Sequence, residues 1–401
     1  MTTPQPPAAL PARMQAVRVH RHGPPEVMVL EETAVPVPGP QQVLVRVHVA
    51  GVNYADLGQR SGSMGPPPGP PEQGAAGQGT AGGPPDGFLP AGPPAGAFSG
   101  PPPGAPPAPG ADQPGPPPAQ AGPHAVTLPY TPGFEVVGTV AALGEGVSGF
   151  SPGQRVAAVL DEGGYAPYAA APAEKTYAVP DALTDAEATL MLVQGLTAYG
   201  LLHDAAQIQP GEWVLVEGAA GGVGSLAVQL AKLAGARVVG AVGSAAKLAQ
   251  IESFGLDLCV NYSEPGWQRR VLEVTGGVQV ILESVGGNVG MAALETAAKF
   301  GRVVMFGGAS GQMLPFPLLM MAMMTRGVKI MGFNPWLRPD TAAHNAQAVA
   351  DALLSGAVKP WLQHFPLGQV SEAHRAIAER RVMGKVVLDI GQADERPVTG
   401  S

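Results

Sequence analysis

The period of the hydrophobic pattern changes about halfway along the chain. Polar and apolar residues alternate in Gln15–His20 and again in Gln42–Val49, and the turn residues Pro36–Pro40 separate these two runs. A further strand-rich stretch extends from Phe134 to Tyr168. Short alternating runs separated by turns are typical of strands that bury one face. The first part of the chain is therefore predicted to form a compact, largely β domain.

From about Thr184 onward, helical patterns alternate with short apolar runs. Strands separated by helical lengths predict a parallel, doubly wound sheet. After Pro335 come two helical patterns, about Thr341–Leu354 and Ser371–Glu379, and a last strand, Lys385–Ile390, which we expect to return to the first domain. The apolar runs are Val214–Glu217, Val238–Val242, Leu258–Asn261, Val278–Glu283, Arg302–Phe306 and Val328–Gly332.

One segment does not fit this plan. Gly65–Pro123 contains 21 Pro and 15 Gly, with no Lys or Arg. Such a composition has few side chains to bury, so we predict a disordered insertion. It is either a tolerated surface loop without function, or a cover over the active site or a docking sequence. Residues 1–13 and 392–401 are expected to be a disordered leader and tail.

The most informative motif follows the first apolar run of the second part. Trp213–Val216 leads into a glycine-rich turn, Gly218–Gly224, and then into a helical pattern and a second strand. The turn reads Ala219-x-Gly221-x-x-Gly224, so alanine replaces the first glycine of the dinucleotide fingerprint. In this strand–turn–helix–strand setting the motif predicts a pyrophosphate at the start of the helix.

The second strand indicates which dinucleotide is bound. NAD recognition usually uses an Asp or Glu at the end of this strand, to bind the ribose 2′-hydroxyl. Here the strand ends Gly240-Ala-Val-Gly-Ser244 without an acid, and Lys247 follows within a turn. A missing carboxylate removes repulsion of a 2′-phosphate and an ammonium attracts it. Tyr262, after the next strand, is a second candidate for the 2′-phosphate. The alternatives are a solvated lysine at Lys247 and a packing residue at Tyr262. The sequence therefore favours NADPH.

Composition excludes several other classes. The net charge of −8 and the absence of a basic stripe argue against nucleic acid. Cys259 is the one cysteine, so disulfides within the chain and zinc sites built on several cysteines are excluded. The chain contains no run of 18 apolar residues, so no membrane span is predicted. We expect a cytoplasmic enzyme without a membrane partner.

Nine segments, in the right order, resemble the zinc-free quinone oxidoreductases, the zeta-crystallin group of the medium-chain dehydrogenase/reductase superfamily. The resemblance implies a Rossmann domain inserted in a GroES-like, β-rich catalytic domain. The expected boundaries are 14–183 and 335–391 for the catalytic domain and 184–334 for the NADPH-binding domain. The segments begin at Met14, Gly51, Arg60, Leu128, Gly195, Ala219, Val260, Ser284 and Gly384.

Zinc alcohol dehydrogenases of this superfamily carry a ligand Cys where this chain has Asn53, and a ligand His where it has Phe134. With at least two ligands missing, we predict no metal site. Hydride transfer to quinones or to conjugated enones and enals is the expected chemistry. The alternatives are an enoyl-thioester reductase, for which the sequence shows no cluster of Lys and Arg, and a non-catalytic NADPH-binding protein of the crystallin or RNA-binding type.

The expected catalytic residues are Asn53, which could donate an N–H to the acceptor oxygen or tie down a loop, and Tyr54, which could line the pocket or supply a proton. Glu135 is expected to have a structural hydrogen-bonding role. The apolar stretch Met313–Met324 predicts a homodimer, with burial inside the monomer as the alternative. The expected cofactor residues are Thr197, Ala220, Gly221, Gly222, Val223, Gly224, Ser244, Lys247, Tyr262, Val285, Gly286, Phe306, Gly307, Gly308, Phe333 and Asn334.

Overall fold

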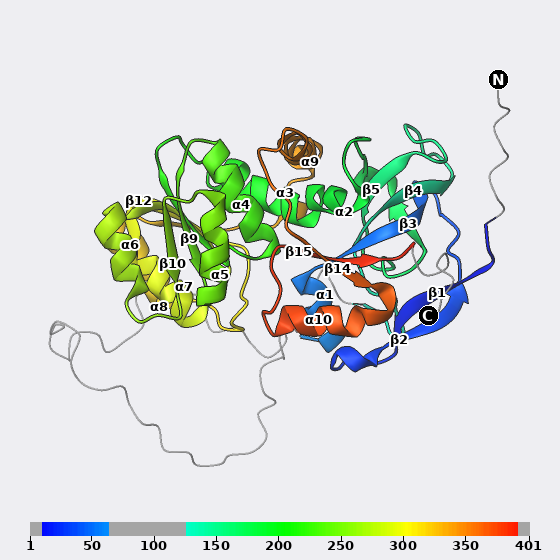
Figure 1. The fold of residues 1–401 in the computed structure, drawn as a ribbon, viewed down its shortest axis with the longest axis horizontal. Helices are drawn as coiled ribbons and strands as arrows, with labels where there is room; N and C mark the ends of the chain where they lie inside the picture. The colour runs from blue at the N-terminus through cyan, green and yellow to red at the C-terminus, as the bar shows by residue number, and fades with distance from the viewer. Residues whose placement is uncertain (1–9, 64–125, 392–401) are drawn as a thin grey trace, which may run out of the picture. The chain divides into compact units, whose positions relative to one another are not determined.

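The computed structural model describes residues 10–63 and 126–391, which form two main sheets and a separate strand pair (Figure 1). The insertion Gly65–Pro123, the tail 392–401 and most of the leader lie outside the described residues. The predictions made for those segments therefore stay predictions.

The first main sheet is built from both ends of the chain. Its strand order is β14-β15-β3-β4-β5-β7, and β6 also pairs with β3. The strand β15, from the C-terminal end, pairs antiparallel with β3, from the N-terminal end. This pairing places the two ends of the chain in one sheet. The strands are β3 (Gln42–Val52), β4 (Glu135–Leu143), β5 (Arg155–Val159), β6 (Tyr168–Pro172), β7 (Thr176–Ala178), β14 (Leu362–Pro366) and β15 (Lys385–Asp389), beside the separate pair β1 (Arg13–Val19) and β2 (Met28–Ala34).

The second main sheet is entirely parallel, in the order β10-β9-β8-β11-β12-β13. Along β8, Val214 and Val216 join one core cluster and Leu215 joins the cluster on the opposite face. Both faces are therefore covered, as in a doubly wound sheet. The strands are β8 (Trp213–Glu217), β9 (Arg237–Val242), β10 (Leu258–Asn261), β11 (Val278–Glu283), β12 (Ala297–Met305) and β13 (Lys329–Gly332).

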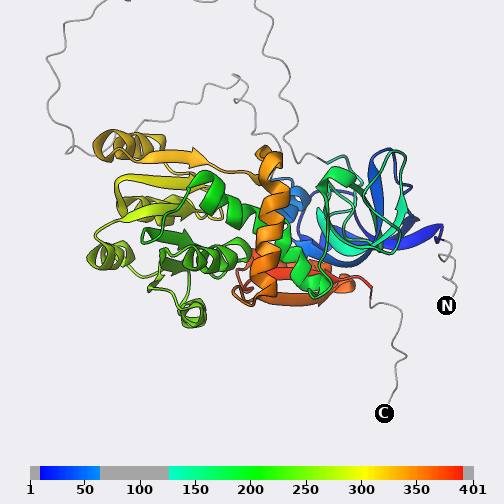
Figure 2. The same cartoon turned by 90° about the horizontal axis from the view of Figure 1, so that it is seen from above.

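Helices cover the two faces of this sheet (Figure 1). Residues of α4 pack into one core cluster, and residues of α6, α7 and α8 pack into the other. Figure 2 shows α9, in orange, beside α3, and the two helices are in contact. No helix within 10–63 and 126–391 is long and apolar enough to cross a membrane. The helices are α1 (Tyr54–Ser61), α2 (Asp185–Ala188), α3 (Val193–Gly200), α4 (Gly222–Leu233), α5 (Ala245–Ile251), α6 (Trp267–Thr275), α7 (Gly287–Glu295), α8 (Phe316–Arg326), α9 (Pro339–Leu354) and α10 (Val370–Ala378).

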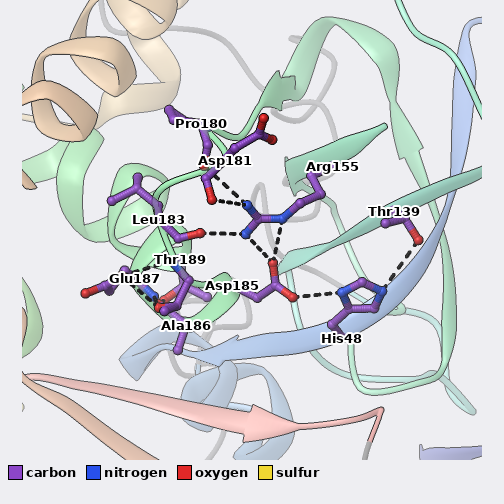
Figure 3. A network of polar contacts seen from close by, with 11 residues as sticks. His48, Thr139, Arg155, Pro180, Asp181, Leu183, Asp185, Ala186, Glu187 and Thr189 are labelled. Carbon is purple, nitrogen blue, oxygen red and sulfur yellow. Dashed lines mark hydrogen bonds and ion pairs between the residues drawn. The ribbon is translucent and has the colours of Figure 1, made fainter. Parts of the chain in front are cut away.

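A polar network holds the connection from β7 to α2 against the first main sheet (Figure 3). Asp185, at the start of α2, accepts hydrogen bonds from His48 of β3 (2.8 Å) and from Arg155 of β5 (2.6 Å). Arg155 also donates to the carbonyl oxygen of Leu183 at 2.7 Å. The hydrogen bond from His48 and the charge of Arg155 lower the pKa of Asp185 to about 2. The connection is therefore held by an ionised carboxylate with two partners.

Candidate functional site

The glycine-rich turn has the geometry that a dinucleotide fingerprint requires. Gly218 lies in the left-handed region, with φ of +61°, and Gly221 is the N-cap of α4. A Cβ on Gly224 would collide with the backbone of Gly218 and Ala219, so the helix packs closely on the strand end. Gly222, Val223 and Gly224 form the first turn of α4. The N–H groups of such a turn lack partners within the helix and suit a phosphate.

A groove of about 700 Å³ lies beyond the end of β9. Ser244 and Lys247, both predicted cofactor residues, line it from the start of α5. Arg380 and Arg381 line it from the segment that follows α10. The hydroxyl of Ser244 accepts a hydrogen bond from the backbone N–H of Lys247 at 3.3 Å, so it also caps α5.

The cations of this groove differ in how they are neutralised. Arg381 donates to the carboxylates of Glu372 (2.8 Å) and Glu379 (2.6 Å). Arg380 instead donates to the carbonyl oxygen of Ala309 at 3.2 Å, which leaves its charge uncompensated by that bond. Burial, and then the charge of Arg380, lower the pKa of Lys247. Two cations that repel each other in one groove suit a multiply charged anion.

Tyr262 belongs to the same region. Burial raises the pKa of Tyr262, and the charge of Arg380 offsets part of this rise. A Cβ on Gly243 would lie only 2.9 Å from the ring of Tyr262, so the glycine after β9 makes room for the tyrosine. Sequence reasoning missed Arg380, and the expectation that no Lys and Arg cluster exists is wrong for the folded chain. The two arginines before Gly384 were the available signal, but they are remote from Lys247 in the sequence.

The loops that follow β11 and β12 are bonded to each other. The backbone N–H of Ala309 donates to the carbonyl oxygen of Ser284 at 3.0 Å, and that of Ser310 donates to Val285 at 2.8 Å. A Cβ on Gly307 would lie 2.8 Å from the Ser284 carbonyl oxygen, so this glycine permits the close approach. The predicted residues Val285, Gly286, Phe306, Gly307 and Gly308 therefore lie in one continuous pair of loops.

Four other predicted residues have partners inside the protein. The hydroxyl of Thr197 donates to the carbonyl oxygen of Val193 within α3 at 2.5 Å. The ring of Phe333 packs against Gly200 of α3. Asn334 accepts a hydrogen bond from the N–H of Trp336 at 3.0 Å. Tyr54 is 60% exposed, and its hydroxyl lies 3.5 Å from the carbonyl oxygen of Ala309.

Asn53 lies in a buried polar network. Its side-chain oxygen accepts hydrogen bonds from Gln194 (2.6 Å) and Lys385 (3.1 Å), and its Nδ2 donates to Glu135 at 3.2 Å. Lys385 also forms a buried ion pair with Glu135 and donates to Gln194 at 2.8 Å. Asn53 therefore has one amide hydrogen outside these bonds. The expected structural role of Glu135 is present, and sequence reasoning missed Lys385 and Gln194.

The absence of a side chain at Gly51 makes room for this network, and the carboxyl group of Asp56 bonds the backbone of Asn53. A Cβ on Gly51 would collide with the carboxylate of Glu135 and with the ammonium of Lys385. Asp56, in the first turn of α1, accepts the backbone N–H of Asn53 at 2.7 Å. Complete burial raises the pKa of Asp56 to about 7. The position of Asn53 is thus set by α1, β4, α3 and β15 together.

Comparisons with known proteins agree with this arrangement. Residues 222–346 match the zinc-binding dehydrogenase family, and residues 118–181 match the alcohol dehydrogenase GroES-like domain. The chain is 30% identical to the quinone oxidoreductase of Sus scrofa, over 94% of this chain and 97% of that protein. It is 27% identical to a 2-haloacrylate reductase of a Burkholderia species, over 94% of this chain and 98% of that protein.

Solved structures lead to the same family. A mycobacterial protein solved in complex with NADPH is 28% identical to this chain, with a TM-score of 0.74, over 94% of this chain and 99% of that one. A quinone oxidoreductase of Pseudomonas syringae is 27% identical, with a TM-score of 0.74 and the same coverage. From its sequence and its fold, the chain belongs to the quinone oxidoreductase family of the medium-chain dehydrogenases/reductases.

Proposed function

We propose that the protein is an NADPH-dependent, zinc-independent reductase that transfers a hydride to quinones or to conjugated enones and enals. The observation that carries the proposal is the groove beyond β9, where Lys247 and Arg380 converge without an acidic residue at the strand end. A carboxylate there would accept a ribose hydroxyl, whereas two cations suit a phosphate on that ribose.

The residues present fit the whole cofactor. Gly221–Gly224 offer backbone N–H groups to the pyrophosphate, and Lys247, Arg380 and Ser244 would hold the 2′-phosphate. The loops containing Val285 and Gly308 follow parallel strands, the usual position of the rest of a dinucleotide. The mycobacterial relative was solved in complex with NADPH, which supports the choice of cofactor. When bound, NADPH supplies the hydride.

The acceptor is the less specified half of the proposal. Asn53 has one free amide hydrogen with which to stabilise negative charge on an acceptor oxygen. Within 10–63 and 126–391, no group of three or more His, Cys, Asp and Glu lies together as metal ligands would. Without a Lewis acid, acceptors that spread the incoming charge over their own conjugated system are favoured. The 2-haloacrylate reductase among the relatives acts on one such conjugated compound.

Two other functions are weaker. An enoyl-thioester reductase would need cations for a carrier phosphate. The cations gathered here line the groove beside Ser244, which is the position proposed for the 2′-phosphate. A non-catalytic RNA-binding role is disfavoured by the net charge of −8. A salt titration of RNA binding would distinguish this second alternative, because phosphate contacts weaken steeply with salt.

The test is a panel of quinones, enones, enals and saturated aldehydes, with NADPH oxidation followed at a fixed enzyme concentration. We expect turnover of the conjugated acceptors and none of the saturated aldehydes. Dialysis against a strong chelator should leave the rates unchanged. Stoichiometric zinc that is lost together with activity would refute zinc independence, and failure of NADPH to bind would refute the whole proposal.

A further inference from the structure

Two glutamates are buried side by side where β8 and β11 end. Glu217 ends β8 and Glu283 ends β11, two neighbouring parallel strands in which Val216 is opposite Leu282. Each glutamate is 1% exposed. Each strand therefore ends in a carboxyl group, and both groups are removed from water at the edge where a doubly wound fold binds its ligand.

Three consecutive backbone N–H groups donate to this pair. Oε2 of Glu217 accepts the N–H of Ser284 (3.1 Å) and that of Val285 (2.9 Å). Oε1 of Glu283 accepts the N–H of Gly286, the N-cap of α7. The two carboxyl groups therefore hold the backbone of Ser284–Gly286. Ser284 Oγ also donates to the carbonyl oxygen of Glu217, directly before the glycine-rich turn.

Each carboxyl group has one remaining oxygen. Among the described residues, no donor reaches Oε1 of Glu217 or Oε2 of Glu283. Glu217 and Glu283 directly follow the opposed residues Val216 and Leu282, so the two carboxyl groups lie next to each other, and the charge of Glu283 raises the pKa of Glu217. Two ionised carboxylates could not bond each other, because neither carries a hydrogen. One proton shared between the two oxygens satisfies both atoms.

The surroundings indicate which group carries the proton. Glu283 lies at the N-terminus of α7, where the helix dipole favours a negative charge. Burial, and then the charge of Glu283, raise the pKa of Glu217 to about 8. Tyr262, after β10, is a titratable group near the pair, and the charge of Glu217 raises its pKa. Glu217 is thus the protonated partner at neutral pH, and Glu283 is the ionised one.

The Ser284–Gly286 loop is bonded to the loop that follows β12. Through Ser284 and Val285 it holds the backbone of Ala309 and Ser310. The carbonyl oxygen of Ala309 accepts the side chain of Arg380 at 3.2 Å, and the hydroxyl of Tyr54 lies 3.5 Å from it. A change at the carboxyl pair would therefore affect the loops after β11 and β12 and, through Ala309, the side chain of Arg380.

We propose that Glu217 and Glu283 are positioning residues for the cofactor: their shared proton holds Ser284–Gly286 in place, and its loss releases this loop and weakens NADPH binding. When hydroxide removes the proton, two adjacent carboxylates repel each other and bring a second negative charge beside an anionic ligand. This inference rests on the proposed function for the identity of the ligand.

The test is NADPH binding followed by fluorescence between pH 7 and pH 9.5. We expect the dissociation constant of the wild-type protein to rise about tenfold between pH 7 and pH 9, with the slope of one proton. In Glu217→Gln, the amide N–H replaces the proton while the amide oxygen still accepts the loop N–H groups. This variant should bind as tightly as the wild type at pH 7 and lose the pH dependence. Glu264→Gln, an exposed control, should keep it.

NADH serves as a second ligand. It lacks the 2′-phosphate, so titration of Lys247 does not affect its binding, but the carboxyl pair should weaken it with the same pH dependence. A wild-type protein that binds NADPH equally well at pH 7 and pH 9.5, or a Glu217→Gln variant that keeps the pH step, would overturn the proposal.

A cofactor-independent measurement separates this inference from the proposed function. Because the folded pKa of Glu217 is raised, the stability linked to its proton is present below the unfolded pKa and is lost as the pH rises through about 8. The thermal unfolding midpoint without cofactor should fall over this range in the wild type and fall less in Glu217→Gln. If that variant does not fold, Glu283→Gln supplies the same neutral hydrogen bond. An unfolding midpoint that is equally pH-dependent in either variant and in the wild type would refute proton sharing, even if NADPH did not bind.

Discussion

The backbone N–H of Gly384 donates a hydrogen bond to the carbonyl oxygen of Ala220 at 2.8 Å. This bond joins the start of β15, in the first main sheet, to the glycine-rich turn of the second. The next residue along the chain is Lys385, which bonds Asn53 and Gln194 and pairs with Glu135. The glycine-rich turn and Asn53 are therefore connected through the backbone of Gly384 and the side chain of Lys385.

The first prediction concerns Lys385. Lys385→Met would leave the carboxylate of Glu135 buried without its cation, and breaking a buried pair in this way costs about 3–5 kcal/mol. We expect urea unfolding to show a loss of this size. The same change at the exposed Lys299 should cost little. The double variant Lys385→Met, Glu135→Gln should recover part of the loss. A Lys385→Met variant as stable as the wild type would show that the pair is not structural.

Cofactor choice is tested at Arg380 and Lys247. A charge-assisted contact is worth about 1.5–3 kcal/mol, so either change to alanine should lower kcat/KM with NADPH about ten- to a hundredfold. Because NADH lacks the 2′-phosphate, its kcat/KM should hardly change. Arg381→Ala is the matched control, since its charge is already paired with Glu372 and Glu379. Equal losses with both cofactors would remove the phosphate assignment.

Asp185 provides a prediction on acid stability. Its folded pKa of about 2 is depressed, so the linked stability is present above the unfolded pKa and is lost as the pH falls towards 2. Asp185→Asn should destabilise the protein at pH 7 by about 1–2 kcal/mol, discounted because the carboxylate is partly exposed. The difference from the wild type should shrink near pH 3.5. Asp181→Asn, in the same connection, should have little effect, and a pH-independent loss at Asp185 would contradict the ionic account.

Self-association is predicted through α8. Within this helix and the segment before it, Met313, Phe316 and Met324 are each at least 70% exposed. Methionine-rich surfaces pack readily against partners, and large exposed apolar patches mark interaction sites. Light scattering should give the mass of a dimer, and Met324→Glu should give a monomer. Leu233→Glu, at an exposed apolar residue of α4, should leave the mass unchanged. A monomeric wild type at micromolar concentration would exclude the dimer.

The last prediction concerns Gly65–Pro123. Loop closure depends only logarithmically on length, so replacing the segment by a short linker should change stability by no more than a few kcal/mol. We expect the shortened protein to fold and to bind NADPH within about twofold of the full chain. Failure to fold would mean that the segment is structural. A change confined to the KM of the acceptor would indicate a cover over the active site.

The sequence by itself determined the order of the elements and the fold class. Apolar runs such as Val278–Glu283 and the turn before Gly224 are local signals, because a strand buried on both faces and a helix packed on a glycine impose their pattern on neighbouring residues. The missing acid after β9 is equally local. These features can therefore be read without knowledge of what folds against them.

Tertiary structure decided which polar groups meet. Arg380 and Lys247 line one groove, Glu217 and Glu283 end neighbouring strands, and Lys385 bonds Asn53, although each pair is far apart in the sequence. No periodicity marks such a partner, since burial and charge depend on how β15, β8 and β11 are placed and not on adjacent residues. The glycine-rich turn could therefore be found from the sequence alone. The charged side chains near it became evident only when the fold brought distant segments together.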